Sequence, residues 1–331
     1  MKRFKNILCV VDTRADCENA LQRAVELAKN NQASLAVINV MTRDTAGIGM
    51  PDGGPISADL QAARLKSHTQ MVENLLEPFR EQIEISIRIL SGTPFLEIIR
   101  EVLRNEYDLV IKTPEAQDWL APLFGSDDMH LLRKCPCPVW LTKPGSPKTY
   151  RRILAAVDID DIYPEEEDDD EQQQPHNVLN HQILEIASSL SLSNFTELHI
   201  VHVWEAISES SLRSPFINTP ENEIAAYTKK VKQLHATSLD ALINEVASNM
   251  GADALDYLNP QKHLIKGWAR KEIPIFAKSI EADLIVMGTV GRTGIPGFII
   301  GNTAETILNH INCSVLAIKP PGFESPVTLM D

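Results

Sequence analysis

The sequence predicts two tandem α/β domains, each built on a doubly wound, five-stranded parallel sheet. Two observations support this fold class: one set of landmarks occurs twice in the same order, and short apolar runs alternate with helical patterns. The strand runs are almost continuous in apolar residues, which is typical of parallel strands covered on both faces. Alternating strands and helices favour right-handed crossovers. The length of 331 residues agrees with two domains of about 150 residues each.

Four segments of the first half recur in the second half. The first of them is a basic residue followed by an apolar run that ends in Asp12 or Asp158. The offset between matching residues is 146 at Asp12 (158 − 12) and 176 at Lys143 (319 − 143), so the second copy carries insertions. The matching segments are residues 5–12 and 152–158, 35–40 and 198–203, 107–112 and 282–287, and 137–144 and 313–320.

The repeat also predicts the domain bounds. A turn-rich link, Pro144-Gly145-Ser146-Pro147-Lys148, separates the two copies. We expect the first domain at residues 1–144, a linker at 145–150, the second domain at 151–320 and a C-terminal tail at 321–331.

Individual elements follow from local spacing. Strands of the first half are predicted near residues 6–11, 34–40, 83–90, 107–112 and 137–142. Apolar residues recur at helical spacing between the first two strands of each half. They are Ala20, Leu21, Ala24, Val25 and Ala28, and Ile183, Leu184, Ile186, Ala187 and Leu190. Ligands of such sheets bind at the carboxyl ends of the strands, where the strand order reverses.

Charge and hydropathy exclude several classes of protein. The net charge of −14 argues against a general surface for nucleic acid or anionic membrane. The sequence has no apolar run of about 18 residues, the length that a membrane span needs. Met1-Lys2-Arg3-Phe4 leads directly into the first strand, which leaves no room for a secretory signal. We therefore expect a cytoplasmic protein.

The five cysteines fit a reducing compartment because their number is odd. Cys135-Pro136-Cys137 does not have the Cys-x-x-Cys spacing of redox motifs, and no second pair completes a zinc site. Buried cysteine usually behaves as a small apolar residue. We expect these cysteines to be structural.

A glycine-rich segment near the C-terminus is the strongest functional signal. Five of the 15 glycines fall within residues 288–303. An apolar run, 284–287, precedes the segment, and an amphipathic helical pattern follows it. A strand, a glycine loop and a helix N-terminus together surround phosphate with backbone N–H groups.

Each position of this loop has a role if the ligand is phosphate. Gly288 and Gly291 remove side chains where the backbone must approach the ligand. Gly301 opens a helix whose first N–H groups have no intrahelical partner. Asn302 and Thr303 add side-chain hydrogen bonds to phosphate oxygens.

The alternative is a mobile connection followed by an ordinary helix cap. Asn302 with Glu305 three residues later has the pattern of a capping box. Glycine-rich motifs also have many false positives. Spacing alone leaves both interpretations open.

The first copy provides an internal control. Its matching segment, Thr113-Pro114-Glu115-Ala116, has lost two glycines, and its proline lacks an N–H group. Asp127 and Asp128 fall in the first turn of the next helix, where carboxylates satisfy the helix dipole themselves. If the glycines served only the fold, both copies would need them. This asymmetry favours phosphate chemistry in the second domain alone.

These motifs resemble the universal stress protein family, including its tandem form. Nucleotide-binding members carry Gly-x2-Gly-x9-Gly-[Ser/Thr], which Gly288, Gly291 and Gly301 match, with Asn302 in place of Ser/Thr. The resemblance covers nearly the whole chain. It implies the strand order 3-2-1-4-5, an adenine-nucleotide α-hydrolase-like fold, a role in stress response and pairing of two domains within the chain. A homodimer is a further expectation.

The resemblance also implies an ATP-type site, with or without Mg²⁺, in the second domain. Asp158 would approach the ribose and phosphates, or a metal ion on the phosphates. Val203 would offer backbone groups to adenine. Val290 would line the phosphates, and Arg292 either pairs with a phosphate oxygen or lies solvated in the loop. The full predicted set is Asp158, Val203, Gly288, Val290, Gly291, Arg292, Gly301, Asn302 and Thr303.

Two further segments leave alternatives open. The acidic run 165–171 has the composition of a disordered segment, although its carboxylates could hold a divalent cation, or zinc together with His176 and His181. In the loop that replaces the phosphate motif of the first domain, apolar side chains either pack against the partner domain or line a non-nucleotide ligand pocket. These are Trp119, Leu120, Leu123 and Phe124.

The pattern of residues includes no convincing catalytic set. The leading hypothesis is a nucleotide-dependent binding module of stress response. One alternative is an enzyme with slow ATP hydrolysis or adenylyl transfer. Another is a scaffold that binds no nucleotide.

Overall fold

The structure is a computed structural model of the chain. It describes residues 4–12, 17–42, 55–114, 123–159, 175–214, 216–217, 219–251, 257–289 and 300–329.

The described strands form one ten-stranded sheet in the order β3-β2-β1-β4-β5-β10-β9-β6-β7-β8. Each half has the predicted order 3-2-1-4-5, counted within the half. The strands of the first half are β1 (Asn6–Val10), β2 (Ser34–Met41), β3 (Ile85–Ser91), β4 (Leu109–Lys112) and β5 (Val139–Leu141). Those of the second half are β6 (Arg152–Val157), β7 (Glu197–Trp204), β8 (Gln261–Lys266), β9 (Leu284–Gly288) and β10 (Ser314–Ile318).

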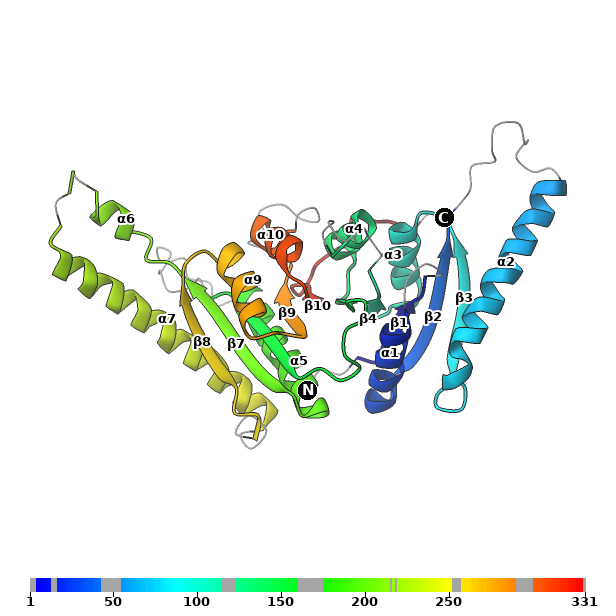
Figure 1. Cartoon of the computed structure of the whole chain (residues 1–331), viewed down its shortest axis with the longest axis horizontal. Helices are drawn as coiled ribbons and strands as arrows, with labels where there is room; N and C mark the ends of the chain where they lie inside the picture. Colours follow the sequence, from blue (N-terminus) through cyan, green and yellow to red (C-terminus); the bar gives the residue numbers. More distant parts are fainter. Residues whose placement is uncertain are drawn as a thin grey trace.

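Helices cover both faces of the sheet (Figure 1). One face carries α1 (Glu18–Asn31), α2 (Pro55–Leu76), α5 (Pro175–Asn194) and α7 (Glu221–Met250). The other carries α3 (Pro94–Asn105), α4 (Ser126–Lys134), α9 (Ala269–Ser279) and α10 (Asn302–His310). Two short helices, η1 (Glu77–Phe79) and α6 (Glu209–Leu212), complete the described set. The apolar residues predicted for α1 and α5 are all buried, as their helical spacing requires.

The two halves join through β5 and β10, the one antiparallel pair of the described sheet. Trp140 pairs with Leu316 at its centre, and Leu141 pairs with Val315. All four side chains are essentially buried. Each of the two main cores therefore contains residues of both halves. The internal pairing that the family resemblance implies is present in this form.

The connection between the halves is held by Arg23 of α1. Its guanidinium lies 3.6 Å from the ring centre of Tyr150 and 5.3 Å from that of Trp140. The same group donates hydrogen bonds to the carbonyls of Pro147 and Lys148. A guanidinium over an aromatic face is attracted by the ring quadrupole. These contacts attach the turn-rich link to the first domain.

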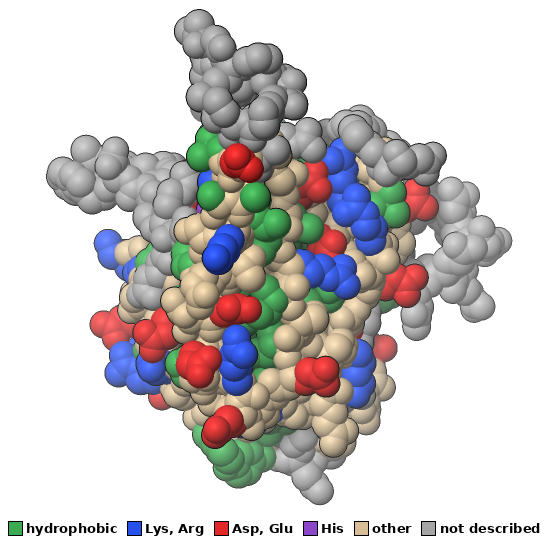
Figure 2. All heavy atoms as spheres, turned by 90° about the vertical axis from the view of Figure 1, so that its right-hand side faces the viewer, with side chains coloured by type: hydrophobic (Ala, Val, Ile, Leu, Met, Phe, Trp, Pro, Cys, Tyr) green, Lys and Arg blue, Asp and Glu red, His purple; other side chains and the backbone are tan. Residues whose placement is uncertain are grey.

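The outer surface at the β3 end is mixed in charge (Figure 2). Blue Lys and Arg side chains alternate there with red Asp and Glu side chains, so neither sign dominates this face.

None of the described helices combines the length and the apolar composition that crossing a bilayer requires.

The junction predicts the effect of truncating Trp140. We expect Trp140→Ala to lower the free energy of unfolding by about 3–5 kcal/mol, because it removes a buried indole where the two halves of the chain meet. The urea midpoint measures this loss. Phe216→Ala is the matched control, since that ring is 97% exposed, and its effect should stay within about 0.5 kcal/mol. Equal midpoints for the two variants would contradict the assignment.

Candidate functional site

A cavity of about 800 Å³ opens at the carboxyl ends of β6, β7 and β9. The strand order of the second domain reverses between β6 and β9, which is where open α/β sheets bind ligands. The volume falls within the range of about 300–1,000 Å³ that is common for small-molecule sites.

The cavity brings together six predicted residues that are far apart in the sequence. They are Asp158, Val203, Gly288, Gly301, Asn302 and Thr303. The other three predicted residues, Val290, Gly291 and Arg292, lie outside the described residues. The described part of the site therefore comes from β6, β7, β9 and the start of α10.

Asp158 is held at the edge of the cavity by Asn180 of α5. The side-chain oxygen of Asn180 accepts a hydrogen bond from the Asp158 N–H at 3.1 Å. Its amide nitrogen donates to the Asp158 carbonyl at 2.5 Å. Asn180 is only 4% exposed, so this pair of bonds is sheltered from water. Sequence reasoning missed Asn180, because a polar residue in a helical pattern carries no signal of the backbone that it binds.

Gly288 ends β9 and has a packing role of its own. A Cβ atom at this position would lie 2.7 Å from Cδ2 of Leu179 in α5. Leu179 also lines the cavity. A larger residue at position 288 would therefore displace Leu179, so packing alone already favours glycine here.

The N-terminus of α10 opens onto the cavity. Gly301 is the N-cap, and it has no side chain with which to cap the helix. Asn302 is the first helical residue, not the cap. The alternative capping box of Asn302 and Glu305 is therefore not formed, and the Glu305 carboxylate instead pairs with Arg133 of α4. Asn302 and Thr303 are exposed side chains that line the cavity.

Aromatic and imidazole side chains that sequence reasoning did not select also line the cavity. His202 Nδ1 lies 3.3 Å from the Val157 carbonyl, which can only accept, so Nδ1 carries a proton. In neutral His202, Nε2 then accepts from His235 Nδ1 at 2.8 Å. His235 lines the cavity. This chain of bonds fixes the orientation of His235.

Trp268 and Arg270 also line the cavity. The indole of Trp268 is 55% exposed, and the Arg270 guanidinium lies 5.3 Å from its ring centre. Trp268 precedes α9 and follows Gly267, whose φ is +145°. A large ring that remains exposed beside a cavity is a surface on which a planar ligand can stack.

The first domain fills the equivalent position with its own side chains. Lys112 Nζ lies 2.7 Å from Asp128 Oδ1, and both side chains are buried. Asp128 Oδ2 also accepts a hydrogen bond from Gly125 N–H at 3.1 Å. The expectation that a carboxylate satisfies this helix end is confirmed. Under the repeat, Lys112 corresponds to Met287 and Asp128 to Ala304, so the second domain has no such ion pair.

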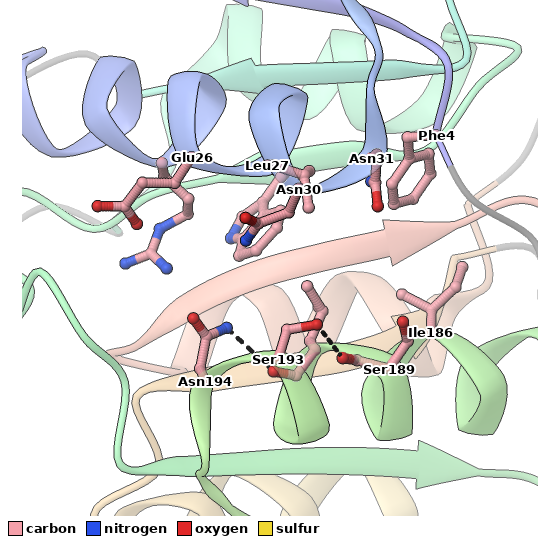
Figure 3. A pocket seen from close by; sticks show the side chains of 12 residues that line it. Phe4, Glu26, Leu27, Asn30, Asn31, Ile186, Ser189, Ser193 and Asn194 are labelled. Atoms are coloured by element: carbon pink, nitrogen blue, oxygen red, sulfur yellow. Dashed lines mark hydrogen bonds between the residues drawn. The ribbon is translucent and has the colours of Figure 1, made fainter. Parts of the chain in front are cut away.

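A second, much smaller cleft lies between α1 and α5 (Figure 3). Glu26, Leu27 and Asn30 face Ser189 and Ser193 across it. Its volume is about 40 Å³, which is enough for one or two waters but not for a nucleotide.

The remaining candidates of the sequence analysis are only partly described. The acidic run 165–171, Trp119 and Leu120 lie outside the described residues, as does the side chain of His176. His181 Nε2 lies 3.1 Å from the Glu245 carboxylate. Within the described ranges, no group of three His, Cys, Asp or Glu side chains is placed to hold a metal.

Leu123 and Phe124, the described part of the apolar loop, belong to the core. Phe124 is 3% exposed, and Leu123 packs against the same core cluster. That cluster contains residues of both halves. Packing, rather than a ligand pocket, accounts for these two side chains.

Comparison with known proteins decides the family. The model of the universal stress protein family matches residues 3–143 and again residues 149–319. The chain belongs to the universal stress protein family. Universal stress protein E of Escherichia coli K12 is 29% identical, with 100% of this chain and 99% of that protein aligned. The Haemophilus influenzae homologue of universal stress protein E is 30% identical, and the alignment covers 96% of this chain and 98% of that protein.

A solved structure has the same tandem architecture. A putative universal stress protein from Pseudomonas aeruginosa UCBPP-PA14 aligns with a TM-score of 0.65 and 25% identity. The alignment covers 96% of this chain and 94% of that one. The universal stress protein fold thus extends over both halves, and the match places the chain among stress-response proteins.

The buried ion pair of the first domain has a measurable cost if it is broken. We expect Asp128→Ala to lower the free energy of unfolding by about 3–5 kcal/mol, because Lys112 is left charged and buried. The double variant Lys112→Met/Asp128→Ala reproduces the residues of the second domain and should recover much of this loss. Denaturant unfolding of the wild type, of Lys112→Met, of Asp128→Ala and of the double variant measures the coupling energy of the pair in a double-mutant cycle. A double variant as unstable as the sum of both singles would refute the ion-pair explanation.

Proposed function

We propose that the cavity of the second domain binds an adenine nucleotide of the ATP type. The single observation that carries the proposal is the cavity itself. It gathers a strand-end aspartate, a strand-end glycine and a helix N-terminus at the point where the strand order reverses. The volume of about 800 Å³ suits a molecule of this size.

The proposed roles follow from position. The start of α10, with Gly301, Asn302 and Thr303, receives the phosphates, because the positive end of the helix dipole and its N–H groups favour anions. Gly288 and the adjoining Val290, Gly291 and Arg292 complete the phosphate loop. Asp158, clamped through its backbone by Asn180, accepts hydrogen bonds from the ribose hydroxyls. Of these residues, Asp158, Gly288, Gly301, Asn302 and Thr303 line the described cavity.

In this proposal the nucleobase occupies the part of the cavity that Val203 and Trp268 line. Val203 of β7 supplies backbone groups to adenine, and Trp268 offers an exposed ring on which the base can stack. Mg²⁺, if present, arrives on the phosphates with Asp158 as its protein carboxylate. This suits a cation that commonly binds through one or two carboxylates and substrate phosphates.

In this proposal the protein acts as a nucleotide-dependent binding module of stress response. Nucleotide occupancy sets the conformation around α10. That helix is also tied to the first domain, through the ion pair of Glu305 with Arg133. The first domain contributes scaffold rather than a second nucleotide site, since the Lys112–Asp128 pair occupies the start of its last helix.

Thermal unfolding with and without Mg-ATP tests the proposal. At 100 times Kd, a ligand that binds only the folded state adds about 2.7 kcal/mol of stability, which is roughly 5–11 °C for a domain of this size. We expect Gly291→Asp to abolish the shift by placing a carboxylate against the phosphates. Ala116→Asp, at the matching position of the first domain, should leave it intact.

The absence of a shift at millimolar Mg-ATP would refute the proposal. Phosphate release from bound ATP, followed over hours, distinguishes a binding module from a slow hydrolase. Recovery of nucleotide from the purified protein would identify the ligand directly.

A further inference from the structure

Cys135 and Cys137 lie side by side between α4 and β5. Their sulfur atoms are 3.6 Å apart and share a hydrogen bond. Both residues are buried. Residues two apart in sequence span at most about 7 Å between Cα atoms, which is close to the upper limit for a disulfide. The sulfurs need to approach by only about 1.5 Å more to form the bond.

A buried lysine of the other domain reaches the last turn of α4, just before this pair. Lys319, the residue after β10, donates through Nζ to the Leu132 carbonyl at 2.5 Å and to the Arg133 carbonyl at 3.3 Å. It is 5% exposed. Burial lowers the pKa of Lys319 to about 8, and the sulfurs of Cys135 and Cys137 oppose that shift. The lysine is therefore electrostatically coupled to both thiols.

The two thiols are unequal as nucleophiles. Burial raises the pKa of the Cys135 thiol, but the hydrogen bond from Cys137 and the charge of Lys319 together bring it below its ordinary value. Burial and the same hydrogen bond raise the pKa of Cys137. Since the thiolate is the reactive form of cysteine, these directions favour Cys135 as the attacking sulfur and Cys137 as the second partner.

Other cysteines of the chain provide matched comparisons. Cys313 occupies the position in the second domain that Cys137 occupies in the first, but Ile311 stands where the partner thiol would be. Burial raises the pKa of Cys313 to about 12, and it also raises the pKa of Cys9. The second domain thus has a cysteine at the same position before its last strand, but it has no second thiol beside it.

We propose that Cys135 and Cys137 form a reversible dithiol that a hydroperoxide oxidises to an intramolecular disulfide. The Cys135 thiolate attacks one peroxide oxygen, the O–O bond breaks, and the leaving hydroxide takes up a proton to become water. The resulting sulfenic acid is attacked by Cys137, the S–O bond breaks, and a second water leaves. Two thiols and one hydrogen peroxide give one disulfide and two waters. A small dithiol reductant restores the thiols by exchange.

The position of the pair connects this chemistry to the domain junction. Cys135 ends α4 through a hydrogen bond from its N–H to the Leu131 carbonyl. Pro138, which follows Cys137, accepts a hydrogen bond from Val110 of β4 just before β5 begins. Oxidation therefore acts between the last helix and the junction strand of the first domain. It does not require the proposed nucleotide site.

Peptide mapping after peroxide treatment tests the proposal. The reduced full-length protein is exposed to graded hydrogen peroxide, denatured, alkylated and digested with trypsin. Cleavage after Lys134 places both cysteines in one peptide. We expect this peptide to escape alkylation and to be lighter by two hydrogen atoms than the dithiol, and dithiothreitol should reverse the change. Cys9 and Cys313 should remain alkylated.

Variants separate the proposed roles. Cys137→Ser should stop the reaction at a sulfenic acid on Cys135 that dimedone traps, whereas Cys313→Ser should leave disulfide formation unchanged. Lys319→Met should slow oxidation, because it removes the positive charge that lowers the pKa of the Cys135 thiol. Lys143→Met is the control, since Lys143 is the residue that matches Lys319 in the first domain, and its Nζ donates to the Asn312 carbonyl instead.

Three outcomes would overturn the proposal: both thiols still alkylated at peroxide concentrations that oxidise a free thiol peptide, addition of oxygen atoms without a disulfide, or a cross-link between two chains. The wild-type map decides each of them even if a variant fails to fold.

Discussion

The architecture depends on the antiparallel pairing of β5 with β10. These are the outer strands of two parallel five-stranded sheets, and pairing them removes one exposed edge from each domain. Trp140 and Leu316 meet at the centre of the junction and are buried in a core that both domains share. The contact also places α4 beside α10, so that Arg133 reaches Glu305 near the start of the helix that opens onto the cavity. The junction therefore determines how these two helices lie relative to each other.

The two domains solve the same local problem in opposite ways. Each ends its fourth strand near the N-terminus of its last helix, where unsatisfied N–H groups attract negative charge. The first domain meets this need internally with Asp128, whose charge Lys112 balances. The second domain has Met287 and Ala304 at those positions and an open cavity beside them. Both copies thus keep the sheet, and within the described residues the cavity at this edge belongs to the second copy.

Much of the fold could be predicted because local patterns of apolar residues determine its strands and helices. Apolar runs and helical spacing placed the strands and the core faces of α1 and α5, all of which the structure confirms. The site could be predicted less completely. Asn302 has the sequence pattern of a helix cap, yet α10 begins one residue earlier than that pattern implies, with Gly301 as the cap. Asn180 gave no signal, because its partner Asp158 lies 22 residues away in the sequence. Trp268 gave none, because the strand ends and helices that share its cavity come from distant parts of the chain.

The sequence by itself determined the duplication, the order of the elements and the asymmetry of the two loops, because each is a comparison of one segment with its copy. Only the tertiary structure decided what those segments meet. It brought the Lys112 ammonium to Asp128, bound the backbone of Asp158 to Asn180, and placed Lys319 of one domain against the Leu132 carbonyl of the other. Such contacts arise from the packing of helices onto the sheet and from the β5–β10 junction. Their energies depend on burial and distance, which no local pattern encodes.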